Sequence, residues 1–128
     1  MDTTKRDKII FWSATTFIFL FEGVMPALFS QSELGKEGVR HLGYPYYFGM
    51  ALVIFKICGT LILIVPKFPK RFKEWAYAGF TFDFIFASIS HFAVDGVVFQ
   101  SFFPLIILAI LMVSYVYYHK LNPEIKTI

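Results

Sequence analysis

The chain has 128 residues and a formal net charge of +3, and 57% of its residues are hydrophobic and 20% aromatic. These proportions exclude an ordinary soluble domain, in which apolar residues make up about half of the chain or less. The length predicts a single domain over residues 1–128.

Four apolar runs predict an all-α fold, a transmembrane four-helix bundle. Each run is close to the ~20 residues that cross a hydrocarbon core of about 30 Å. Because the backbone polar groups of a chain in lipid must be hydrogen-bonded within the segment, we expect these runs to be helices. The predicted helices cover residues 9–29, 45–65, 75–94 and 101–118.

The first predicted helix carries a carboxylate, Glu22, in the outer half of the bilayer. Glu22 lies about fourteen residues from the inner end, or roughly 21 Å at about 1.5 Å per residue. Pro26 follows four residues later and cannot donate to the Glu22 carbonyl, so we expect a kink and a polar notch there. The alternative is that the Glu22 carboxylate simply reaches the outer interface.

Residues 30–44 form the one substantial loop, which has mixed charges and three glycines. Its length allows a short interfacial helix. We expect His41 to be solvated or interfacial rather than a ligand. Pro45 is an early residue of the second helix, where its missing N–H does no harm.

The second predicted helix places Lys56 about ten residues from each end, too deep for its ammonium group to reach water comfortably. Gly49, Gly59 and Thr60 share its helix face at about 100° per residue, so a neighbouring helix can approach closely. Cys58 is the only cysteine, which excludes an internal disulfide and a CxxC motif. We expect it to be a buried small residue.

The third predicted helix begins at Glu74, where an acidic residue complements the helix dipole. Asp83 lies about nine residues from its inner end, roughly 13 Å up, which is also the level of Lys56. Small residues, including Gly79 and Ala87, share the face that carries Asp83. An ionisable group at this depth needs a partner and marks a functional site. We therefore predict that Asp83 pairs with Lys56.

His91 lies two turns beyond Asp83, at roughly 25 Å and near the level of Glu22. We predict a second pair between His91 and Glu22. The two pairs would form one connected polar cluster that binds a small polar ligand or relays protons, consisting of Glu22, Lys56, Asp83 and His91. The alternative is a buried ion pair that fixes the register of the helices without chemistry.

The fourth predicted helix contains no charged residue. Pro104 is in its first turn, and Ser114 is its only deep hydroxyl group apart from the tyrosines near its inner end. We expect this helix to contribute packing alone.

The basic residues predict the orientation in the membrane. With the amino terminus in the cytoplasm, nine of the twelve basic residues lie inside, two lie outside and one lies within the membrane. The nine are Lys5, Arg6, Lys8, Lys67, Lys70, Arg71, Lys73, Lys120 and Lys126. This asymmetry predicts both termini in the cytoplasm. We expect the membrane to be a bacterial inner membrane. It also indicates attraction to anionic lipid head groups rather than to nucleic acid.

Three stretches resemble the DoxX-like family of small four-helix membrane proteins. They are HLGYP at residues 41–45, FKICG at residues 55–59, and KEWAYAGFTFD followed by SISH within residues 73–91. The resemblance covers most of residues 22–96 and implies a link with quinones or redox stress, because the family is named after a small subunit of a thiosulfate:quinone oxidoreductase. It supplies no catalytic residue.

Three functions remain open from the sequence. The first is a redox accessory that binds a quinone or a similar small molecule for a membrane enzyme partner. The second is a small proton-coupled transporter, and the third is a structural or assembly protein without chemistry of its own.

No cofactor other than a quinone is expected, and no metal. A haem held by two histidines would need a second deep histidine, whereas His41 and His119 lie outside the predicted core. The chain has no independent catalytic motif, so the sequence favours a non-enzymatic role without deciding it. The lipid bilayer is the expected partner, and a homo-oligomer stays open.

Overall fold

The computed structural model describes residues 5–121, and every regular element in that range is a helix. Four stretches are long and apolar enough to cross a membrane: Lys5–Phe29, Tyr46–Ile64, Lys70–Asp95 and Phe99–Leu121. The predicted all-α fold with four spans is therefore confirmed. Lys126, one of the basic residues assigned to the inner side, lies outside the described residues.

The elements follow one another along the chain with short connections. In order they are α1 (Lys5–Ile18), the π-helix η1 (Phe19–Val24), α2 (Met25–Phe29), α3 (Glu33–His41), α4 (Tyr46–Ile64), α5 (Lys70–Asp95) and α6 (Phe99–Leu121). The loop after the first span thus contains a short helix, α3, with Ser32 as its N-cap; the Ser32 side chain accepts a hydrogen bond from the N–H of Gly35.

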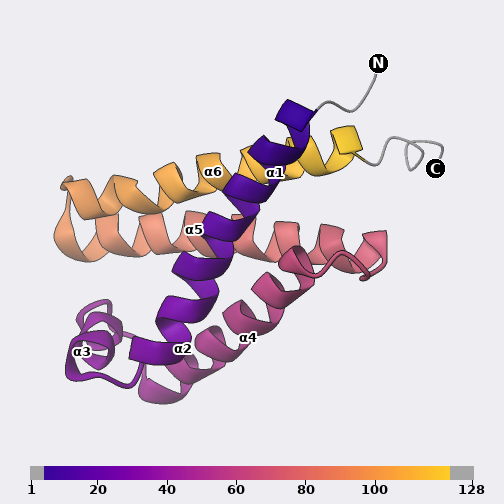
Figure 1. Ribbon diagram of the computed structural model, residues 1–128. Helices are drawn as coiled ribbons and strands as arrows, with labels where there is room; N and C mark the ends of the chain where they lie inside the picture. The colour runs from indigo at the N-terminus through magenta and orange to yellow at the C-terminus, as the bar shows by residue number, and fades with distance from the viewer. Residues whose placement is uncertain (1–4, 122–128) are drawn as a thin grey trace.

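Helices α5 and α6 run antiparallel side by side, and α1 crosses them (Figure 1). The turn between α5 and α6 uses Gly96, whose φ of 78° suits a residue without a side chain. Helix α4 leans away from α6 and packs on α5 and η1 instead. Helix α3 lies at the end opposite to the start of α1.

The core lies where α1, α5 and α6 meet, and three hydroxyl groups cross it. Ser114 on α6 is hydrogen-bonded to Thr15 on α1 and to Tyr77 on α5, at 2.7 Å in each case. In lipid there is little hydrophobic force between helices, so such bonds and close packing hold the bundle together. The buried apolar side chains around them are Phe11, Ile18, Leu63, Phe80, Phe84, Ile107, Leu111 and Tyr118.

The prediction that the third span begins at Glu74 was wrong, because α5 already begins at Lys70. Hydropathy detects only the part of a helix within lipid, and this helix continues for a turn beyond it. Lys73, in that extra turn, is buried and donates to the carbonyl oxygens of Ile62 (2.8 Å), Leu63 (3.1 Å) and Val65 (2.7 Å). It therefore caps the end of α4, whose last carbonyls have no helical partner.

The irregularity expected near Pro26 takes the form of the π-helix η1. Its C-cap, Met25, donates its N–H to the carbonyl of Leu20, five residues back. Gly23 in this segment lies against Thr60 of α4; a Cβ atom added to Gly23 would be 2.4 Å from Thr60 Oγ1. The missing side chain of Gly23 thus allows η1 and α4 to touch.

We expect Gly23→Ala to destabilise the protein, because the added methyl group overlaps the buried side chain of Thr60. Overpacking of this kind costs about 1–3 kcal/mol. Thermal unfolding in detergent should show a lower melting temperature. Gly79→Ala is the matched control: its added Cβ meets nothing within 4 Å, so the melting temperature should stay unchanged or rise. Equal effects of the two substitutions would contradict the close contact.

Candidate functional site

Lys56 lies between two carboxylates at membrane depth. Its Nζ is 3.1 Å from Glu22 Oε1 and 3.9 Å from Asp83 Oδ2. The three residues come from α4, η1 and α5 respectively. The predicted contact of Lys56 with Asp83 is present, but Glu22 is the nearer partner. The structure therefore links three of the four predicted residues directly, and we call Glu22, Lys56 and Asp83 the charged triad.

Small residues on α4 bring the members of the charged triad within reach of one another. Thr60 lies against Gly23 of η1, next to Glu22 in the chain. Gly59 lies against α5: a Cβ atom added to it would be 2.8 Å from Cε2 of Phe80. A larger residue at Gly59 would overlap the ring of Phe80, which would have to shift.

The charged triad has one more carboxylate than it has cations. When all three groups are ionised, two carboxylates and one ammonium give a net charge of −1. Charges taken out of water are stable only when they are paired and hydrogen-bonded. The side chain of Glu22 is 8% exposed, whereas the side chains of Lys56 and Asp83 are 28% and 21% exposed. The two more exposed members of the charged triad, Lys56 and Asp83, thus lie next to an open space.

That space is a groove of about 950 Å³ between α4 and α5, which α3 bounds at one end. Lys56, Asp83 and His91 all line it. The rest of its surface is mostly apolar and rich in aromatic rings, including Phe48, Phe55, Phe72, Trp75, Phe80, Phe82 and Phe86. Its size and its few polar groups match those of small-molecule sites, which are predominantly apolar with a few placed polar groups.

Cys58 also lines the groove and is exposed, which contradicts the prediction of a buried residue. Helix α4 packs on η1 and α5 and leaves much of its circumference open, so a small residue there is not automatically covered. Within the described residues, no group of three or more histidine, cysteine, aspartate or glutamate side chains is arranged to hold a metal ion.

His91 does not pair with Glu22, which was the predicted partner. Its Nδ1 is 2.9 Å from Oδ2 of Asp95, one turn further along α5. The other oxygen of Asp95 is 2.5 Å from Nε2 of His41 on α3. His41 is half exposed, as expected of an interfacial residue, yet it also ties α3 to α5. Sequence reasoning missed Asp95, although its spacing of four residues from His91 was a readable signal.

A further polar contact that the sequence did not predict joins α5 and α6 near their other end. The carboxylate of Glu74 accepts a hydrogen bond from the hydroxyl group of Tyr115 at 3.0 Å and contacts Nε2 of His119 at 2.7 Å. Glu74 was expected only to complement a helix dipole. These side chains do not line the groove, and their contacts hold the two helices together.

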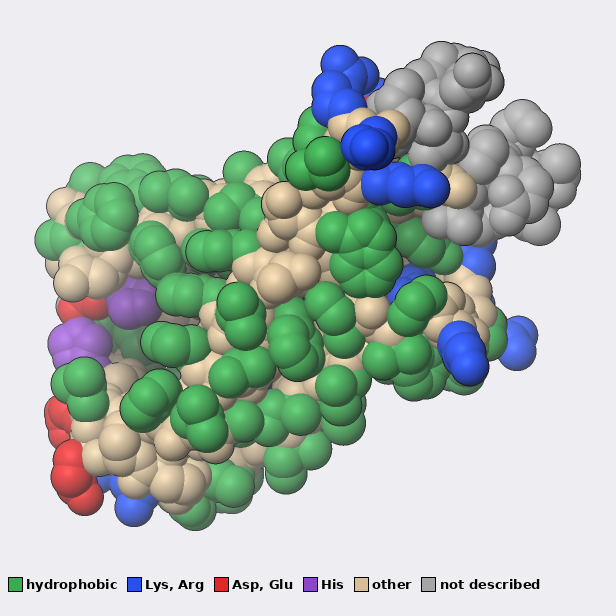
Figure 2. Space-filling view, in the orientation of Figure 1, with side chains coloured by type: hydrophobic (Ala, Val, Ile, Leu, Met, Phe, Trp, Pro, Cys, Tyr) green, Lys and Arg blue, Asp and Glu red, His purple; other side chains and the backbone are tan. Residues whose placement is uncertain are grey.

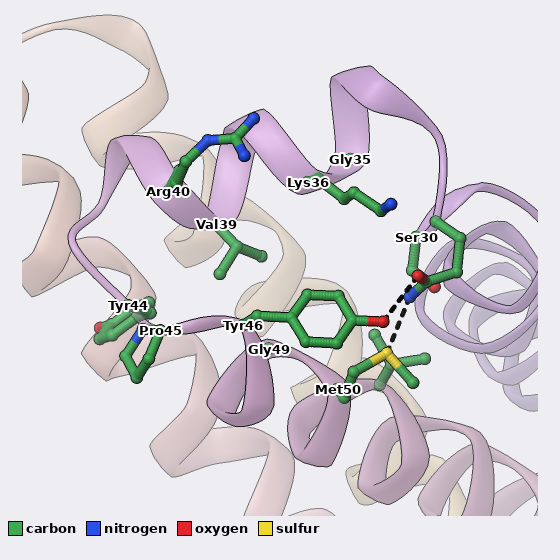
Figure 3. Close-up of a pocket in the computed structure, with 12 residues that line it drawn as sticks. Ser30, Gly35, Lys36, Val39, Arg40, Tyr44, Pro45, Tyr46, Gly49 and Met50 are labelled. Carbon is green, nitrogen blue, oxygen red and sulfur yellow. Dashed lines mark hydrogen bonds between the residues drawn. The ribbon is translucent and has the colours of Figure 1, made fainter.

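A second cavity, of about 320 Å³, lies between α3, the end of α2 and the start of α4 (Figure 3). Three of its side chains are bonded to one another: Tyr46 donates to Gln31 Oε1 at 2.9 Å, and Gln31 Nε2 lies 2.7 Å from Met50 Sδ. Val39 points toward Gly49 on its inner side. Because this cavity contains no group of the charged triad, the groove is the stronger candidate site.

Comparison with known proteins gives one match. The DoxX-like family matches residues 10–114, a range that includes the charged triad and His91. Neither the comparison with curated proteins nor that with solved structures gave a match.

We expect the coupling energy between Lys56 and Glu22 to exceed that between Lys56 and Asp83, because the first pair is closer and more buried. Double-mutant cycles with Lys56→Met, Glu22→Gln and Asp83→Asn measure both energies. Lys56→Met alone leaves two carboxylates without a cation and should cost about 3–5 kcal/mol. Adding Glu22→Gln should recover most of that loss.

A larger coupling with Asp83 than with Glu22 would contradict this ranking. Urea unfolding in mixed micelles gives the four free energies of each cycle, provided that unfolding is reversible. As a matched control, Lys67→Met removes an exposed lysine outside the groove and should leave the stability within about 0.5 kcal/mol.

Proposed function

The chain belongs to the DoxX-like family, and from this premise we propose that it binds a quinone-type small molecule in the groove between α4 and α5. In this proposal the protein is an accessory subunit that holds the molecule for a membrane redox enzyme. The observation that carries the proposal is the position of Lys56, Asp83 and His91 on an otherwise apolar, aromatic groove.

The chemistry of the groove suits such a molecule. A quinone is a flat ring with two polar oxygen atoms, so it offers apolar faces to the phenylalanine rings and hydrogen-bonding groups to the charged side chains. The ammonium of Lys56 can donate to one oxygen atom. Partly exposed charges are costly at membrane depth, and an occupant that covers them is favoured for that reason.

The two alternatives are less well supported. For a proton-coupled transporter, the carboxylates of Glu22 and Asp83 would have to exchange protons, whereas both lie within 4 Å of the ammonium of Lys56, which partly neutralises them. A purely structural role accounts for that contact. It does not account for the exposure of Lys56 and Asp83 to a groove, because intramembrane charges that face a cavity mark ligand or ion pathways.

The proposal includes the orientation with both termini in the cytoplasm of a bacterial inner membrane. Most of the lysines and arginines gather at the end where α1 begins and α6 ends (Figure 2). Acidic residues and histidines occupy the other end in the same view. Positive charge concentrates on the cytoplasmic side of membrane proteins, which supports this orientation.

Labelling of single cysteines tests the orientation. In a Cys58→Ala background, Glu33→Cys on α3 should react with a membrane-impermeant maleimide in intact cells. Lys67→Cys, in the loop between α4 and α5, should react only after the cells are broken. Both positions are exposed, so access alone decides the result. The reverse pattern would overturn the proposed orientation.

Fluorescence tests the binding site, because the chain has only two tryptophans. Trp75 lines the groove and Trp12 does not. In a Trp12→Phe protein, a water-soluble quinone should quench Trp75 along a saturable curve. Lys56→Met in that protein should weaken binding by about tenfold or more, since a hydrogen bond to a charged group contributes about 1.5–3 kcal/mol.

The matched control is the Trp75→Phe protein, in which Trp12 should show only linear, collisional quenching. Size-exclusion chromatography of each variant checks that it is folded. Linear quenching of both tryptophans, with no saturation, would overturn the proposed function.

A further inference from the structure

We propose that the groove prefers the reduced form of its occupant, a hydroquinone whose ring lies over Ala87 with one hydroxyl group at Asp83 and the other at His91. This inference rests on the proposed function and specifies which form of the molecule is bound and where. We call Asp83, Ala87 and His91 the ring seat. All three line the groove.

The backbone spacing of the ring seat is close to the length of such a ring with its hydrogen bonds. Asp83, Ala87 and His91 follow one another at intervals of four residues, so they share one face of α5. Eight residues of α-helix rise by about 12 Å. A six-membered ring with oxygen atoms at opposite corners, hydrogen-bonded at both ends, needs about 11 Å between its partners.

The side chains between the two polar ends leave room for the ring. Ala87, at the middle of the ring seat, offers only a methyl group. Phe82 and Phe86 also line the groove and are largely exposed, so their rings can cover the faces of the occupant. Aromatic pairs in stacked or edge-to-face arrangements stabilise such contact.

The hydrogen-bonding groups of the ring seat favour an occupant that donates hydrogen bonds. Ionised Asp95 is an acceptor, so the Nδ1 of His91 that faces it carries the hydrogen. In the tautomer with the hydrogen on Nδ1, Nε2 is the acceptor, and His91 lines the groove. The same carboxylate also contacts His41, which holds Asp95 in place.

Asp83, at the other end of the ring seat, also favours an occupant that donates a hydrogen bond. Asp83 is 3.9 Å from Lys56, whose ammonium lies nearer to Glu22. Its carboxylate can therefore accept a further hydrogen bond. A hydroquinone donates to both acceptors, and its oxygen atom at Asp83 can also accept from Lys56. A quinone can accept from Lys56 in the same way, but it has no hydrogen to donate to Asp83 or to His91. Buried acceptors left without a donor are unfavourable, and this difference favours the reduced form.

Calorimetric titration of the purified full chain under anaerobic conditions tests the inference, with tailless 1,4-benzoquinone and the corresponding hydroquinone as probes. We expect the hydroquinone to bind at least about tenfold more tightly. Equal affinities, or tighter binding of the quinone, would overturn the preference and leave the proposed function standing. Absence of binding by both probes would overturn the proposed function and the ring seat together.

Two substitutions test where the ring lies. Ala87→Leu fills the ring seat without changing a polar group and should reduce hydroquinone affinity by at least about tenfold. Gly79→Leu places the same side chain in the same groove on the other side of Asp83, and should change the affinity less than threefold. The opposite result would overturn the position over Ala87.

Asp95→Ala tests the role of His91. Without the carboxylate, Nδ1 is no longer fixed as the protonated nitrogen, so Nε2 can donate as well as accept. The preference for hydroquinone should therefore fall toward equal affinity for the two probes, while binding persists. An unchanged ratio of affinities in this folded variant would overturn the assignment of His91 as an acceptor.

Discussion

The ammonium of Lys56 has carboxylates of two other helical segments within 4 Å, and much of the bundle is arranged around that contact. In lipid, a charge without a partner is far more costly than in water, so the segments that carry the three charges must approach closely. The π-helix η1 directs Glu22 toward α4, and Gly23 and Gly59 remove the side chains that would hold the helices apart. Local sequence, helix contact and charge pairing thus depend on one another.

The buried, hydrogen-bonded core and the open groove lie in different parts of the molecule. Where α1, α5 and α6 meet, the hydroxyl groups of Thr15, Tyr77 and Ser114 are bonded to one another and buried, and no charge lies among them. The span of α4 is the least buried of the four, and α4 leaves the groove beside α5. The unit of α1, α5 and α6 therefore forms one wall of the groove through α5, and α4 forms the other. Asp83 and His91 lie on the first wall, and Lys56 lies on the second.

The sequence predicted the four spans and the depth of the charged residues because both follow from hydropathy and the rise of a helix. It gave the Lys56 to Asp83 contact correctly but not the closer contact with Glu22. Counting residues along a helix predicts how deep a side chain lies in the membrane, but it assumes regular α-helical geometry. The π-helix η1 departs from that geometry and shifts the direction in which Glu22 points. The contact of His41 with Asp95 joins a loop helix to α5, and the arrangement of loops depends on tertiary contacts that residue patterns do not contain.

Charge balance connects the charged triad with the groove. A triad of two carboxylates and one ammonium that was closed off from all other groups would carry an uncompensated charge in lipid. Here Glu22 is covered, and the partly exposed members, Lys56 and Asp83, line the groove. The remaining acceptor capacity is therefore available to a hydrogen-bond donor that enters between α4 and α5. An apolar lipid chain in the groove would cover the phenylalanine rings and leave that capacity unmet, whereas a ring with a donor group satisfies both.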